Sequence, residues 1–412
     1  MESCKDIVIV GGGIAGLSLA LALHRLGLKS LVVESSDELR VSGAAFVTWT
    51  NAWKALDALG VGDLLRPQHC RLSGIIVTSA TSGLPTAELS YGNHEVRCVK
   101  RRVLLETLAN ELPTNTIRFS SKVVSLEKSG YLKLLHLADG STLKTKVLIG
   151  CEGIKSTVAG WLGFNKPSFA KRFAIRGYVH LKENHGLKPV FLQFTGHGYR
   201  YGIIPCDSTA IYWFFTFFSS DQDDELKDNP MKMKEYVLNN LGQVEDHIKA
   251  IIEKTEMEDI ICSPITFRPP WEILWGDISK ENVCVAGDAF HPMTPDIGQG
   301  ACATLEDTIV LARCLAEAFP MSRSEEQEKS EREEYRRIET SLKKYAKDRK
   351  WRCIDLVTTA YFVGSMQQSD GKLVKFLRDK VLAPFLASLL LKKADFDCGR
   401  LRIHDSDLPY PP

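Results

Sequence analysis

One stretch near the N-terminus limits the fold of this chain more than any other. A run of β-branched residues, Ile7–Val10, meets the glycine turn Gly11-x-Gly13-x-x-Gly16, and an apolar helical pattern then continues to Gly27. This spacing allows a tight strand-to-helix turn and close packing of the helix on the strand. The sequence therefore predicts a β-α-β unit of a Rossmann-like α/β fold.

The unit closes with a second apolar strand, which ends in Glu34, 18 residues after Gly16. The helix N-terminus at Ile14 and Ala15 offers unpaired N–H groups and partial positive charge to an anion. Gly13 lets a pyrophosphate approach the backbone, and a carboxylate at position 34 can accept hydrogen bonds from a ribose diol. This order indicates a dinucleotide-binding site; the other interpretation is a glycine turn in an ordinary α/β unit.

The composition argues against several classes of protein. The chain has 412 residues, of which 25% are charged, and its formal net charge of +1 gives no sign of nucleic acid or anionic lipid. The eleven cysteines are scattered without a CxxC pair, which argues for reduced thiols and against a zinc site. No segment resembles a signal peptide or a membrane span. We expect a cytoplasmic protein of two or three domains without stable membrane insertion.

A second motif lies in the C-terminal half. A short apolar strand, Val283–Ala286, leads to Asp288, and Pro295 and Gly298 then interrupt a loop before a long helical pattern that begins near Gly300. A carboxylate at the end of a buried strand can hydrogen-bond a polyol, although it could also cap a turn. The rigid loop leads to a helix N-terminus, whose positive end would stabilise an anion.

These motifs together resemble single-component, FAD-dependent aromatic monooxygenases of the p-hydroxybenzoate hydroxylase class, and within it the plant branch that is 3-hydroxybenzoate 6-hydroxylase-like. The stretch Val283–Asp307 reads VCVAGDAFHPMTPDIGQGACATLED and is similar to the GD…PxxGQG signature of that class. The resemblance implies FAD as cofactor, NADPH or NADH as electron donor and O₂ as co-substrate. It also implies hydroxylation or epoxidation of a small aromatic or electron-rich specialised metabolite through a C4a-hydroperoxyflavin.

The resemblance implies roles for single residues. Arg101 resembles the arginine that touches the cofactor, Asp288 the residue assigned to the ribitol of FAD, and Pro295–Gly300 the backbone beside the flavin N1–C2=O edge. At Glu152-Gly153 the chain departs from the Asp-Gly of many relatives, a motif linked to the pyrophosphate and to NAD(P)H, so a nicotinamide role there stays open. The residues expected to bind the cofactor are Gly11, Gly13, Ile14, Ala15, Gly16, Glu34, Arg101, Asp288, Pro295, Gly298 and Gly300.

The same class implies a division of the chain into domains. It has a Rossmann-like FAD-binding domain of the GR2 type, with an inserted mixed β-sheet substrate domain and C-terminal helices. We expect the FAD-binding domain to be discontinuous, over residues 1–70, 96–172 and 267–350, with the substrate domain over 71–95 and 173–266 and a C-terminal helical segment over 351–412. The charge-rich tract Ser322–Arg352 is typical of a solvated helix.

The expected substrate pocket depends on an aromatic strand, Ile211–Phe218. Period-2 alternation sends the even-numbered residues 212–216 to one face of this strand and the odd-numbered residues 213–217 to the other. Packing in the core is the alternative for each pocket candidate. The candidates are Ala45, Arg176, Tyr201, Tyr212 and Phe214.

Other functions remain open. A related flavoprotein could be a halogenase or a reductase, although the WxWxIP sequence of halogenases is missing, and a flavin-binding sensor would lack turnover. No residue stands out as a catalytic base. We expect no metal, because His291 has no second ligand at metal spacing and is assigned a structural role. We expect a monomer or weak homodimer whose partners are a small aromatic substrate and O₂, with no nucleic acid.

Overall fold

The β-α-β unit at the N-terminus forms the centre of the first sheet. The computed structural model describes residues 4–40, 44–219, 228–319, 331–368 and 389–401. Strand β1 (Lys5–Val10) runs into helix α1 (Ile14–Arg25), and the chain returns as β2 (Ser30–Val33), parallel to β1. The side chains from Ile7 to Val10 are buried, as expected for a strand covered on both faces.

The first sheet combines a parallel core with an antiparallel extension. Its strand order in the described part of the chain is β16-β17-β10-β1-β2-β7, and β9 and β8 continue antiparallel from β10. Asp139-Gly140 forms the turn between β9 and β10. The further strands are β7 (Ile117–Arg118), β8 (Val123–Ser129), β9 (Leu132–Leu137), β10 (Thr142–Gly150), β16 (Ser279–Lys280) and β17 (Val283–Val285).

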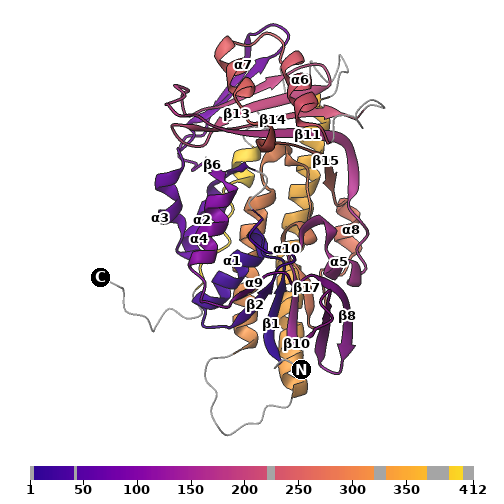
Figure 1. The fold of residues 1–412 in the computed structure, drawn as a ribbon. Coiled ribbons are helices and arrows are strands. Elements are labelled where there is room, and N and C mark those ends of the chain that lie inside the picture. The colour runs from indigo at the N-terminus through magenta and orange to yellow at the C-terminus, as the bar shows by residue number, and fades with distance from the viewer. Residues whose placement is uncertain (1–3, 41–43, 220–227, 320–330, 369–388, 402–412) are drawn as a thin grey trace, which may run out of the picture.

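The second sheet is mixed and lies across one end of the molecule in Figure 1. Its order is β15-β11-β14-β13-β12-β4-β5, in which β12 and β4 are parallel and the other neighbours antiparallel. Its strands are β4 (Gly74–Ser79), β5 (Pro85–Ser90), β11 (Ser168–His180), β12 (Phe191–Thr195), β13 (Tyr199–Pro205), β14 (Ala210–Phe218) and β15 (Ile260–Phe267).

Two helices cover the outer face of the second sheet. Helices α6 (Pro230–Asn239) and α7 (Asp246–Glu253) pack there on the odd-numbered aromatic residues of β14, Trp213, Phe215 and Phe217. The even-numbered residues of β14 are turned to the opposite face, toward the rest of the molecule. The predicted period-2 alternation along this strand is therefore confirmed.

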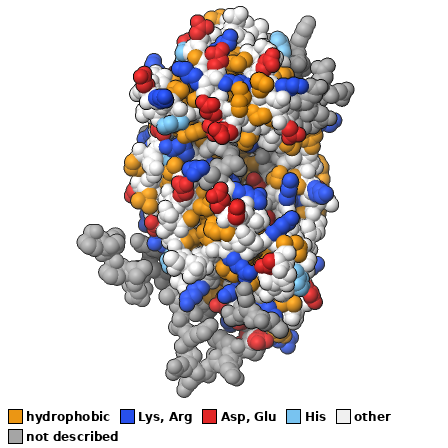
Figure 2. Space-filling model, viewed as in Figure 1, with side chains coloured by type: hydrophobic (Ala, Val, Ile, Leu, Met, Phe, Trp, Pro, Cys, Tyr) orange, Lys and Arg blue, Asp and Glu red, His pale blue; other side chains and the backbone are white. Residues whose placement is uncertain are grey.

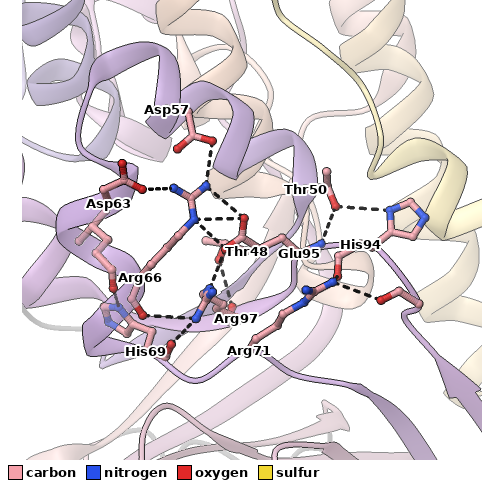
Figure 3. A network of polar contacts seen from close by, with 12 residues as sticks. Thr48, Thr50, Asp57, Asp63, Arg66, His69, Arg71, His94, Glu95 and Arg97 are labelled. Atoms are coloured by element: carbon pink, nitrogen blue, oxygen red, sulfur yellow. Dashed lines mark hydrogen bonds and ion pairs between the residues drawn. The ribbon is translucent and has the colours of Figure 1, made fainter. Parts of the chain in front are cut away.

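The segment between the sheets is held together by arginines. Strands β3 (Ala45–Thr48) and β6 (Arg97–Lys100) form a two-stranded sheet, and helices α2 (Thr50–Leu59) and α3 (Gly62–Leu65) follow β3. Figure 3 shows Arg66, which forms ion pairs with Asp57, Asp63 and Glu95. Arg97 also forms an ion pair with Glu95. Both guanidinium groups lie over the Trp53 ring, 5.2 and 5.3 Å from its centroid. This network has a structural role.

Two long helices connect the sheets. Helix α9 (Gly300–Ala318) packs against α1 and against α10 (Glu331–Gln368), which runs without interruption through position 350. Ile338, Leu342 and Tyr345 of α10 are fully buried, so the expectation of a solvated helix is wrong for one of its faces. The remaining helices are α4 (Arg101–Asn110), α5 (Thr157–Trp161) and α8 (Pro270–Trp275).

Several other expectations can be compared with the structure. All eleven cysteines are free thiols. Among the described helices, none combines the length and the apolarity that crossing a bilayer requires. Positive and negative side chains are mixed over the face seen in Figure 2. Of the expected C-terminal segment 351–412, residues 369–388 and 402–412 lie outside the described residues.

Candidate cofactor and substrate site

The three glycines of the N-terminal turn serve different purposes. Gly11 has a φ of 106°, and a Cβ there would lie 2.6 Å from the carbonyl oxygen of Cys151. A Cβ on Gly16 would lie 1.9 Å from the carbonyl oxygen of Gly11, so α1 packs on β1 only with glycine at this position. A Cβ on Gly13 would meet no protein atom within 4 Å. Gly13 therefore borders open space at the start of α1, where glycine serves the site and not the fold.

Glu34 holds the turn as well as facing the cavity. Its carboxylate accepts hydrogen bonds from the backbone N–H of Gly12 at 2.6 Å and of Ser36 at 2.8 Å. The residue is 8% exposed. The acid at the end of β2 thus fixes the glycine turn, and the predicted contact with a ribose would be an additional one.

Arg101 and Asp288 face the same space from different elements. Arg101 begins α4, and its Nε is buried without a hydrogen-bond partner in the described structure. Asp288 follows β17 and is exposed to the cavity. Burial lowers the pKa of Arg101, and the carboxylate of Asp288 opposes this shift. Arg102, one position further, is exposed, and its Nη1 lies 3.6 Å from Oε1 of Glu106.

The loop before α9 is rigid and internally paired. Gly298 has a φ of 62°, and Asp296 accepts hydrogen bonds from Arg172 at 3.0 and 2.7 Å and from Arg200 at 3.0 Å. Burial works against ionisation of Asp296, but Arg200 and Arg172 outweigh it and hold the pKa of the carboxyl below its usual value. The loop places the N-terminus of α9, at Gly300, on the cavity.

One cavity of about 820 Å³ joins these groups to the second sheet. It extends from the glycine turn to the inner face of β4, β5, β11, β12, β13 and β14. Most residues expected from the sequence are brought together on its wall. They are Gly11, Gly13, Ile14, Ala15, Glu34, Arg101, Asp288, Pro295, Gly298 and Gly300 on the cofactor side, and Ala45, Arg176, Tyr212 and Phe214 on the substrate side.

Two expected residues do not reach the cavity wall. Gly16 is a packing residue of the turn. The placement of Tyr201 in the pocket is corrected: its ring stacks on Phe194 at 4.6 Å and its hydroxyl donates to the carbonyl oxygen of Leu241 at 2.7 Å. Tyr201 therefore lies on the outer face of β13, in the core that α6 and α7 cover.

Sequence reasoning missed several wall residues. Gln193 comes from β12, and Trp49 and Tyr91 pack edge to face at 5.3 Å. Leu390 and Leu391 belong to a C-terminal segment that no motif marks. That segment is anchored where the N–H of Asn51 donates to the carbonyl oxygen of Ala394 at 2.9 Å. Only alternation along β12 could have indicated Gln193.

Glu152, the departure from Asp-Gly, is turned to helix α5. Its carboxylate accepts from the N–H of Thr157 at 3.0 Å and from the hydroxyl of Ser156. Burial raises its pKa, and the hydrogen bonds from Ser156 and Thr157 oppose that shift. The longer side chain thus caps α5 at the edge of the cavity.

His291 belongs to a buried polar cluster behind the cofactor side. Its Nε2 lies 2.6 Å from Asp307, which also accepts from Arg349 at 2.7 Å and from the N–H of Gly287 at 2.9 Å. Cys353 completes a trio with the spacing of metal ligands. Both carboxylate oxygens of Asp307 are already in use and a guanidinium is adjacent, so the cluster is better suited to holding the 287–291 loop than to binding a cation.

Comparison with known proteins gives consistent matches over almost the whole chain. A family model described as FAD binding domain matches residues 5–342. "Monooxygenase 2" of Arabidopsis thaliana is 53% identical over 404 residues, which cover 97% of this chain and 99% of that protein. "Monooxygenase 1" of the same plant is 34% identical over 402 residues, covering 96% and 99%.

The fold is also found among solved structures. The crystal structure of Klebsiella pneumoniae HpxO complexed with FAD and uric acid matches with a TM-score of 0.81 at 22% identity. The match covers 95% of this chain and 96% of that chain. The Rossmann-like fold with a second mixed sheet and C-terminal helices is therefore shown.

Proposed function

Because this chain belongs to the FAD binding domain family and is an FAD-dependent monooxygenase, we propose that it oxidises NADPH or NADH and inserts one oxygen atom from O₂ into a small aromatic or electron-rich metabolite. Within the family we propose the p-hydroxybenzoate hydroxylase class, from the signature over Val283–Asp307. The crystal structure of HpxO contains uric acid together with FAD, which supports a small ring compound as the substrate of this chain.

The observation that carries the proposal is the continuity of the cavity. The glycine turn, where a dinucleotide would be held, and the aromatic face of the second sheet line one cavity of about 820 Å³. Pockets for small molecules usually measure roughly 300–1,000 Å³, so this cavity is large enough for part of a cofactor and a second molecule. A shared cavity supports chemistry in which the two meet away from water.

The residues of the cofactor side fit FAD. The open space beside Gly13 admits a pyrophosphate at the N-terminus of α1, and the unpaired Nε of Arg101 and the exposed carboxylate of Asp288 offer a donor and an acceptor to its polar chain. Gly300 presents a second helix N-terminus, whose partial positive charge would stabilise negative charge on the ring system. FAD itself supplies the electron transfer and the activation of O₂.

The residues of the substrate side provide a largely apolar wall. Phe191, Phe214 and Ile204 lie there, and Tyr212 is 8% exposed with its ring turned to the cavity. Such a wall orients a flat ring and excludes water, which would otherwise divert reducing equivalents to H₂O₂.

We also propose the division of the chain into a cofactor part around the first sheet and a substrate part around the second sheet. Helix α10 is then shared between the cofactor part and the C-terminal segment.

The test starts from the purified protein. We expect one FAD per chain by absorbance, and oxidation of NADPH with uptake of O₂ when a panel of phenolic and indolic compounds is supplied. Product mass after reaction under ¹⁸O₂ should rise by one labelled oxygen atom. NADPH oxidation that releases only H₂O₂ with every compound, or a halogenated or reduced product, would overturn the proposal.

A further inference from the structure

Gln193 is a buried polar side chain on an otherwise apolar part of the cavity wall. It is 6% exposed and lies in β12 between Phe191 and Thr195, which face the cavity with it. Leu192 and Phe194 alternate to the other face and pack in the outer core. Within the residues that the structure describes, the side-chain amide of Gln193 makes no hydrogen bond.

Two threonine hydroxyls on this wall already have partners within the protein. The hydroxyl of Thr86 donates to the carbonyl oxygen of Val77 at 3.1 Å, and that of Thr216 to the carbonyl oxygen of Arg200 at 3.1 Å. A primary carboxamide has two donors and an acceptor to satisfy, and leaving them unpaired out of water is costly. Gln193 is therefore arranged for a partner that enters the cavity.

The space beside Gln193 suits a flat ring. Gly202 lies opposite Gln193 in the β12–β13 register, and a Cβ there would lie 2.6 Å from the rings of both Phe191 and Phe214. These two rings meet edge to face, with centroids 6.1 Å apart and planes at 73°. Glycine at 202 thus lets two aromatic side chains meet over the strand position that pairs with Gln193. Aromatic surfaces favour a planar partner.

We propose that Gln193 determines specificity by pairing with a neighbouring donor and acceptor on one edge of a flat ring. The oxygen and the nitrogen of a carboxamide lie side by side, so both are satisfied by such an edge, as when glutamine reads adenine in DNA. A cyclic amide, or the equivalent hydroxylated nitrogen heterocycle, has this edge, whereas a simple phenol offers a single hydroxyl. The inference rests on the proposed function and names the substrate class of the same site.

The experiment measures equilibrium binding to the FAD-loaded protein by the change in flavin absorbance. The probes are 2-quinolone, which carries the N–H and C=O edge, and N-methyl-2-quinolone, which has lost the donor. We expect 2-quinolone to bind roughly tenfold more tightly, because the methylated probe leaves a buried group unpaired. In Gln193→Leu the two probes should bind equally.

Controls separate this result from damage to the fold. Gln193→Asn, which withdraws the amide by one methylene, should lose part of the preference. Thr107→Val, at a residue of α4 that is absent from the cavity wall, should keep all of it. FAD content reports folding of each variant. Equal binding of both probes by the unaltered protein, or an unchanged preference in Gln193→Leu, would overturn the inference. Because the assay uses neither NADPH nor O₂, that failure would leave the proposed monooxygenase reaction standing, and loss of turnover would leave the binding result standing.

Discussion

The two ends of the cavity are built on different principles. At the cofactor end, the backbone of one short stretch, the glycine turn, makes the central part of the site. A Cβ is excluded at Gly11 and Gly16 by the chain itself, and at Gly13 only by a ligand that enters. At the substrate end, side chains make the site, and they come from six strands of the second sheet. The first kind of site is read from a local spacing, while the second depends on register between distant strands.

This contrast predicts which substitutions damage binding and which damage folding. A side chain that points into open space at the cofactor end should remove the ligand and spare the fold. A side chain that points into the protein should lower the free energy of unfolding and leave FAD binding by the folded protein intact. At the substrate end, single substitutions should change selectivity and coupling by smaller factors, because each wall residue contributes one of many contacts.

The largest loss of FAD affinity is expected for Gly13→Val. Gly13 has φ −84° and ψ −167°, which valine can adopt, and the new side chain meets only the cavity. FAD affinity should fall by on the order of 100-fold, about 2.7 kcal/mol, with little change in the free energy of unfolding of the apoprotein. Equilibrium dialysis with FAD and urea unfolding measure the two quantities.

Gly16→Val is the matched control for that variant. Its Cβ would lie 1.9 Å from the carbonyl oxygen of Gly11, so the turn must open and the fold should lose on the order of 3 kcal/mol. If both variants lose FAD and stability equally, the distinction between the glycines is wrong.

A smaller loss of FAD is expected for Arg101→Ala. The Nε of Arg101 is buried without a partner in the described structure, so it is available to the cofactor, and removing a charged hydrogen bond costs roughly 1.5–3 kcal/mol. FAD affinity by dialysis should fall about 10- to 100-fold. Arg102→Ala removes an exposed arginine and should change FAD affinity by less than about twofold. Equal losses of FAD affinity in the two variants would contradict a contact between Arg101 and the cofactor.

The cluster behind the cofactor end should give stability with a defined pH dependence. Burial opposes the charge on His291, but Cys353 and Asp307 outweigh it and raise its pKa well above the usual value, while the pKa of Asp307 is lowered by His291 and Arg349 despite burial. The histidine contribution is therefore complete below about pH 6.5 and is lost as pH rises through the raised pKa. The aspartate contribution is present above about pH 4 and is lost as pH falls through the lowered pKa.

We therefore expect His291→Gln to lower the free energy of unfolding by about 2 kcal/mol near pH 6 and by less at pH 9. Urea unfolding at saturating FAD measures the difference. His136→Gln changes a histidine at the surface, beside Glu127, and should show a difference below about 0.5 kcal/mol at each pH. A penalty for His291→Gln that grows with pH would contradict the assignment.

The sequence was sufficient for the parts of the molecule that local chemistry decides. The β-α-β unit, the turn at Asp139-Gly140 and the two faces of β14 follow from spacing and alternation, and the structure confirms them. The expectation of Tyr201 in the cavity wall is wrong for a physical reason. Alternation assigns the residues of β13 to two faces, but it does not tell which of these faces α6 and α7 cover. No motif marks Gln193, since its proposed role depends on Gly202, which pairs with it on the neighbouring strand.

The C-terminal segment shows the same limit. Leu390 and Leu391 lie some 90 residues after the loop that they accompany in the cavity wall, so no pattern connects them. The segment is positioned by long-range contacts: Arg352 donates to the carbonyl oxygen of Lys393 at 2.8 Å and lies over the Phe396 ring, 4.5 Å from its centroid. Leu390 packs against an apolar cluster that includes Ile297, a residue of the rigid loop before α9.

The smallest effect is expected at this wall. Leu390→Ala removes apolar surface beside the loop that borders the proposed flavin position, so water gains access and more of the electrons from NADPH should end in H₂O₂. We expect the share of H₂O₂ per NADPH to rise about threefold, roughly 0.6 kcal/mol in relative barrier, with FAD content unchanged. Leu84→Ala, at a leucine that is 66% exposed and absent from the cavity wall, should leave that share unchanged. If the two variants release equal H₂O₂ while both hydroxylate the same compound, Leu390 only packs against Ile297, and the substrate end owes its dryness to the second sheet alone.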